Sequence, residues 1–123
     1  MECNEQQELC SVYPGDSISY DLTFEWDDGT PIDVTGMTIW YTAKLNPTDA
    51  EGLAHNIQVS HVFPVGSDSA IGIGVVTVPS EKTKGLIPGR HMRYDFVLVD
   101  GSAITTVGAG SFVVLQNVMI NKR

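Results

Sequence analysis

Nine consecutive residues that alternate strictly between apolar and polar side chains constrain this chain more than any other feature. Within Ile18–Trp26 every second side chain is apolar, and the residues between them are Ser, Asp, Thr and Glu. Successive side chains of a β-strand point to opposite faces, so the pattern predicts a strand with one buried face. The alternation also places the last apolar residue, Trp26, in the core.

Similar but less regular patterns recur along five later segments, 37–45, 56–63, 71–78, 91–99 and 103–116, with turn sequences such as Asp-Asp-Gly and Asp-Gly-Ser between them. The segments with helical periodicity are too short to form a helix of more than one or two turns. The chain is therefore predicted to be all-β, an antiparallel β-sandwich of about seven strands. Two glycines in the last strand, Gly108 and Gly110, predict a bulge or bend. The side chains expected to point inward are Ile18, Tyr20, Leu22, Phe24, Ile39, Tyr41, Val75, Tyr94, Phe96 and Phe112.

The length of 123 residues fits one domain. We predict an extended, polar N-terminal arm over residues 1–14, the sandwich over residues 15–118 and a short tail over residues 119–123. We also expect the sandwich to be stable without the arm. A hydrophobic share of 42% and a charged share of 18% indicate a globular chain. No apolar run reaches the roughly 20 residues of a membrane helix, so we expect no membrane partner.

Charge is distributed unevenly along the chain. Residues 1–51 carry eleven acids and one base, a net −10, whereas residues 52–123 carry four acids and six bases, a net +2, which together give −8. Such an acidic chain is not expected to bind nucleic acid unaided. Two interpretations of the distribution remain: a solvated acidic surface, or two unlike surfaces that attract copies of the chain or a neighbour.

The two cysteines, Cys3 and Cys10, both fall in the arm. The first residues have neither the basic nor the apolar region of a signal peptide, so we expect a reducing compartment and free thiols. A disulfide formed on later exposure to air is the alternative.

Residues that could perform chemistry are scattered. His55, His61 and His91 lack metal-ligand spacing, and the Asp27, Asp28 and Asp33 cluster lacks the alternating ligands of a calcium loop. No G-x-S-x-G sequence marks a nucleophile. We therefore predict that the protein is not an enzyme and needs no metal or cofactor.

Trp40 lies on the polar face of its predicted strand, among Thr38, Thr42 and Lys44. An exposed tryptophan on a sheet is typical of a protein contact. Packing under a loop and stacking on a carbohydrate are the alternatives for this side chain.

Five stretches together resemble one family of tailed-phage structural proteins. They are Gly15–Phe24, Asp28–Gly36, Leu86–Arg90, Tyr94–Gly101 and Gly110–Leu115, with a GD-strand-DG-x-P-I-D-x-T-G order at the start. The combination resembles the N-terminal module of the phage baseplate upper protein family, over about residues 15–116. The resemblance implies an immunoglobulin-like sandwich in a virion, assembled in the host cytoplasm.

The expected function is therefore that of a non-enzymatic virion protein at the tail, baseplate or fibre attachment. A capsid cement or decoration protein is the alternative within virions, and a carbohydrate-binding module is the alternative from another class. The expected partners are other virion proteins and copies of the chain, in a homo-oligomer. The predicted contact residues are Leu9, Val12 and Tyr13 in the arm, Trp40 on the sheet, and the bases Lys82, Lys84, Arg90 and Arg93, which would attract the arm's glutamates.

Overall fold

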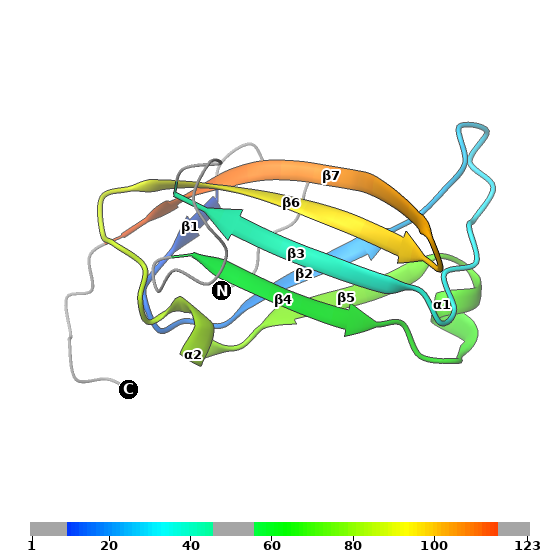
Figure 1. Cartoon of the computed structure of the whole chain (residues 1–123), viewed down its shortest axis with the longest axis horizontal. Coiled ribbons are helices and arrows are strands. Elements are labelled where there is room, and N and C mark those ends of the chain that lie inside the picture. The colour runs from blue at the N-terminus through cyan, green and yellow to red at the C-terminus, as the bar shows by residue number, and fades with distance from the viewer. Residues whose placement is uncertain (1–9, 46–55, 116–123) are drawn as a thin grey trace.

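The computed structural model describes residues 10–45 and 56–115, and the chain there forms two β-sheets with two single-turn helices (Figure 1). In chain order the elements are β1 (Cys10–Val12), β2 (Ile18–Thr23), β3 (Thr38–Lys44), β4 (Ile57–Val62), α1 (Ser67–Ala70), β5 (Ile73–Val78), α2 (Ser80–Thr83), β6 (His91–Asp100) and β7 (Ala103–Val114).

The larger sheet has the order β1-β7-β6-β3-β4, and the smaller sheet pairs β2 with β5 (Figure 1). Every pairing between neighbouring strands is antiparallel except that of β1 with β7, which is parallel. An immunoglobulin domain likewise separates its second and fifth strands from the sheet that holds its third, sixth and seventh. The predicted all-β sandwich of about seven strands is confirmed.

Side chains from both sheets meet in one core, and nine of the ten residues predicted to point inward are buried. The exception is Val75, which is 48% exposed, while its neighbour Val76 is buried. Both faces of β5 carry β-branched residues, so its sequence alone did not determine which face points inward. Pairing decides it, because Val76 lies opposite the buried Tyr20 of β2.

The prediction that Trp26 lies in the core is wrong, because its side chain is 62% exposed. Strand β2 ends at Thr23, and the chain turns back on itself shortly afterwards. The backbone N–H of Trp26 donates to the carbonyl of Thr30 at 2.8 Å, and its carbonyl accepts from Gly29 at 2.9 Å. The backbone of Trp26 is therefore hydrogen-bonded within a local turn, although the alternating sequence continues to this residue.

The predicted boundary between arm and sandwich at residue 14 is also corrected. Cys10 lies opposite Phe112 and Val12 opposite Val114 in the β1–β7 pair, and the Leu115 N–H donates to the Val12 carbonyl at 2.9 Å. Val12 is fully buried in the core, so it is not an anchor for a neighbour. Three residues are too few to display a period, which is why the sequence did not reveal this strand.

Deleting residues 1–13 is consequently expected to destabilise the sandwich. The deletion removes β1 and the buried Val12 side chain, and burial of one valine side chain contributes about 1.5–3 kcal/mol. Thermal unfolding of the truncated and full chains provides the measurement. An unchanged midpoint would show that residues 1–13 are dispensable for folding, as the sequence predicts.

The bulge predicted in the last strand is confirmed. The register of β6 against β7 shifts between Phe96 and Val97, which lie opposite Gly108 and Thr106, so Val107 is the extra residue. Gly110 leaves room for the ring of Tyr94, because a Cβ at this position would lie 2.6 Å from the ring carbon Cζ.

Two tyrosines at the centre of the core share a hydrogen bond. The hydroxyls of Tyr20 and Tyr41 are 2.9 Å apart, and the rings of Tyr94 and Phe96 pack around them. Burial disfavours the phenolate, so it raises the pKa of both Tyr20 and Tyr41 above the usual value.

These shifts predict a loss of stability in alkali. The unfolded chain releases the two protons near pH 10, whereas the folded chain retains them, so the free energy of unfolding falls as the pH rises beyond about 10. Urea denaturation between about pH 9 and pH 11 measures the slope. A variant with both Tyr20→Phe and Tyr41→Phe should show a shallower slope, because it lacks the two buried hydroxyls. Lysines titrate in both proteins and therefore cancel in the comparison. Equal slopes would show that Tyr20 and Tyr41 do not cause the loss of stability.

Candidate functional site

Three connections meet at one end of the sandwich, which we call the loop end. They are the β2–β3 loop (24–37), the β4–β5 connection (63–72) and the turn between β6 and β7 at residues 101–102, all on the right of Figure 1. Backbone hydrogen bonds tie the first two together, from Val34 to the Ser69 carbonyl at 3.0 Å and from Gly36 to the Phe63 carbonyl at 2.9 Å. The loop end is therefore built on hydrogen-bonded backbone rather than on independent loops.

Gly72 forms the tightest point of this junction. The Phe24 N–H donates to the Gly72 carbonyl at 2.7 Å, and Gly72 has a φ of +77°. A Cβ at this position would lie 2.8 Å from the Ile32 carbonyl oxygen and still closer to that of Phe24. Only glycine combines this backbone conformation with such a close approach.

Two aspartates shape the β2–β3 loop. Asp28 accepts the Thr30 N–H and Asp33 accepts the Thr35 N–H, each at 2.9 Å. Hydrogen bonds from the hydroxyl and then the backbone of Thr30 hold the pKa of Asp28 below its usual value, and Thr35 acts in the same way on Asp33. These carboxylates stabilise turns. Within residues 10–45 and 56–115, no three His, Cys, Asp or Glu side chains gather as a set of metal ligands.

A cleft separates the β2–β3 loop from the bulged part of β7. Its walls are Thr23–Asp28 and Ile32 on one side and Thr105–Val107 on the other. Trp26 forms part of the wall. Ile104, which is 72% exposed, lies opposite Val99 of β6 and belongs to the outer face of the larger sheet instead. An exposed tryptophan on the wall of a cleft is typical of a surface that a protein contact covers.

Among residues 10–45 and 56–115, acids gather at the loop end and bases at the opposite end of the sandwich. The described acids of the loop end are Glu25, Asp27, Asp28, Asp33, Asp68 and Asp100, and the described residues there include no lysine or arginine. The five described bases lie at the other end, on the left of Figure 1, where Asp16 and Glu81 are the neighbouring acids. We call this the basic end, and its bases are Lys44, Lys82, Lys84, Arg90 and Arg93.

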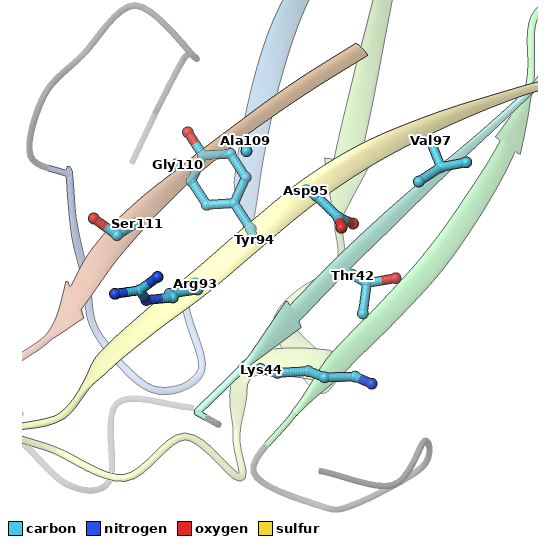
Figure 2. Close-up of a pocket in the computed structure, with 9 residues that line it drawn as sticks. All are labelled: Thr42, Lys44, Arg93, Tyr94, Asp95, Val97, Ala109, Gly110 and Ser111. Carbon is cyan, nitrogen blue, oxygen red and sulfur yellow. The ribbon is translucent and has the colours of Figure 1, made fainter. Parts of the chain in front are cut away.

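A groove crosses the outer face of the larger sheet, on the side away from the core (Figure 2). Strand pairing sets Thr42 beside Asp95 and Lys44 beside Arg93, and small residues of β7 form the far wall. Trp40 lies one row further along, opposite Val97, and is 40% exposed. The predicted exposure of Trp40 on a polar face is confirmed.

The structure brings together some of the predicted contact residues. Trp40 and Arg93 share the outer face of the larger sheet, and Lys82, Lys84 and Arg90 lie at its adjoining basic end. Val12 is in the core, and Tyr13 is half-buried where β1 ends. Leu9, Cys3 and His55 lie outside the described residues.

Sequence reasoning missed two exposed residues of the loop end, Trp26 and Ile104. Both stand next to turn sequences, Asp27-Asp28-Gly29 and Asp100-Gly101-Ser102. Giving those turns more weight than the alternation would have found Trp26, because side chains beside a protruding turn have no opposite sheet to cover them.

The chain matches no protein-family model and no curated protein. Over the residues that the structure describes, no helix is long and apolar enough to cross a membrane. The two charged ends and the outer groove are therefore the features from which a function can be inferred.

Proposed function

We propose that this chain is a non-enzymatic structural module of a phage particle, which joins copies of itself and neighbouring virion proteins at the tail, baseplate or fibre attachment. The motifs between Gly15 and Leu115 that resemble the baseplate upper protein family support this proposal. A rigid sandwich of immunoglobulin type also suits repeated assembly, because it presents the same surfaces in every copy.

The segregation of charge between the two ends of the sandwich carries the proposal. A surface that is merely solvated needs no such sorting, whereas complementary ends orient one protein against another and speed their encounter. Exposed apolar side chains accompany the acids at the loop end, with Trp26 the largest. Charge alone would give a contact that salt readily screens, so an apolar component is required for a lasting one.

Particle composition tests this function. Particles purified from cells that express the gene together with its genomic neighbours are expected to contain the chain at a fixed copy number, measured by quantitative mass spectrometry. A capsid protein in the same sample supplies the reference. Recovery of the chain only in the fractions that lack particles would contradict the proposal. A copy number that matches the capsid lattice rather than the tail would favour a decoration protein.

A carbohydrate-binding module is the second candidate, and the outer groove favours it. The hydroxyl of Thr42, the carboxylate of Asp95 and the guanidinium of Arg93 line the groove (Figure 2). Trp40 lies in the neighbouring row of the sheet, opposite Val97. Polar side chains beside an exposed indole are suited to hydrogen-bonding and stacking on a sugar. A glycan array decides, because this function requires a defined set of positive glycans that Trp40→Ala abolishes and Trp26→Ala leaves intact.

A further inference from the structure

We infer that copies of this chain bind one another head to tail, with the loop end of one copy receiving the segment Lys84–Arg90 from the basic end of the next. The inference rests on the proposed function, because it names the surface and the partner through which an assembly module would join its own copies. It commits to a second copy as the occupant of the cleft beside Trp26.

The receiving surface is apolar at its centre and acidic at its rim. Trp26 is exposed on the wall of the cleft, and the partly buried, apolar Ile32 and Val107 line it beside Trp26. Glu25, Asp27 and Asp28 belong to the same cleft wall. Because no described lysine or arginine lies at this end, a cationic partner would meet no repulsion there.

The entering segment has the complementary arrangement. Ile87 is 40% exposed, and it stands between the exposed Lys84 and Arg90. Its neighbour Leu86 is buried in the core, so Leu86 anchors the segment while Ile87 projects away from it. An apolar side chain between two cations thus faces an apolar surface bordered by carboxylates.

Backbone bonds fix the entering segment in place. The Leu86 N–H donates to the Thr83 carbonyl at 3.1 Å, and the Gly89 N–H donates to the Val114 carbonyl of β7 at 2.8 Å. A segment held in this way loses little conformational freedom on binding, which lowers the entropic cost of the contact.

The two surfaces are different and lie at opposite ends of the molecule (Figure 1). A contact between them is heterologous, so a pair of bound copies retains one free loop end, on one copy, and one free basic end, on the other. Such contacts close into a ring if the rotation between copies permits it, and otherwise extend into a filament. Either outcome is consistent with a repeated position in a particle.

Mixing two complementary variants tests the inference. The loop-end variant carries Trp26→Ser and Asp27→Lys, and the basic-end variant carries Ile87→Ser and Arg90→Glu. Asp28 is left unchanged because its carboxylate holds the turn. Sedimentation velocity should show a concentration-dependent series of oligomers for the unmodified chain and monomers for each variant alone.

An equimolar mixture should contain dimers and nothing larger, because only one productive pair of ends remains. A control variant carries Trp40→Ser and Asp21→Lys, which repeat the chemical changes of the loop-end variant on other surfaces, and it should associate like the unmodified chain. Far-ultraviolet circular dichroism and thermal unfolding verify that every variant is folded.

Variants that still associate alone would overturn the inference. A mixture that stays monomeric although the unmodified chain associates, or an unmodified chain that is monomeric up to about 1 mM, would do the same. Binding of the unmodified loop end to a different purified virion protein, with no binding to its own copies, would also overturn it. None of these results changes the particle composition measured by mass spectrometry, so the proposed function fails or survives separately.

Discussion

Replacing Phe96 by alanine is expected to lower the free energy of unfolding by about 3–5 kcal/mol. The side chain is fully buried between the two sheets. Its ring centroid lies 5.1 Å from that of Tyr20 on β2 and 5.2 Å from that of Tyr41 on β3. Truncation would therefore leave a cavity where three strands meet, and neighbouring rings cannot collapse into it without abandoning their own packing.

Thermal unfolding measures this effect, which corresponds to a fall of about 10–20 °C in the midpoint for a domain of this size. Val97→Ala is the matched control, because the adjacent side chain lies on the outer face and is only partly buried. The control should cost much less. An unchanged midpoint for Phe96→Ala would mean that the inner and outer faces of β6 have been assigned the wrong way round.

Replacing Gly72 by alanine is expected to cost about 2–5 kcal/mol, although it adds a single methyl group. Part of the cost is the left-handed backbone conformation, with its φ of +77°. The remainder arises because the new Cβ would press on the carbonyl oxygens of Phe24 and Ile32, and backbone atoms cannot rotate away as a side chain does. The junction that holds the β2–β3 loop would have to open.

Gly101→Ala separates the two contributions. Gly101 has a φ of +61°, yet a Cβ there would meet no heavy atom within 4 Å. This control should therefore cost only the conformational part, about 1–2 kcal/mol. Urea denaturation gives both values. Equal losses at the two positions would show that the close approach at Gly72 does not restrain the loop end.

Strict alternation predicted the core wherever one face of a strand is covered and the other is not. It placed Tyr20, Tyr41 and Phe96 correctly, because a slip of one residue in their strands would move polar side chains inward. The same rule failed at β5, where Val75 and Val76 are equally apolar and the pairing with β2 makes the choice. A pattern with two apolar faces contains no information about which face is buried.

Non-local pairing explains why the sequence did not reveal β1. Strand β1 is three residues long and pairs with residues of β7 that lie 102 positions later in the sequence, as Cys10 with Phe112. The burial of Val12 depends on that partner, and no local pattern around Val12 reports it. Trp26 shows the opposite case, since a local turn overrides an alternation that points to the core.

The sequence predicted that charge is unevenly distributed, but not where the charged surfaces lie on the molecule. Counting charges separated an acidic first part from a basic second part, but strand directions decide where each charge lies. Lys44 belongs to the acidic part of the sequence, yet β3 runs back and delivers it to the basic end. Asp68 and Asp100 belong to the basic part and lie at the loop end for the same reason. Topology, rather than composition, creates the two ends.

Single-particle electron cryomicroscopy of the purified particle tests the central claim most directly. We expect density for repeated copies of the sandwich, with the loop end of each copy, including Trp26, buried against the segment Lys84–Arg90 of the next. Particles in which the sandwich has no density, or in which Trp26 faces solvent in every copy while other surfaces make the contacts, would contradict it.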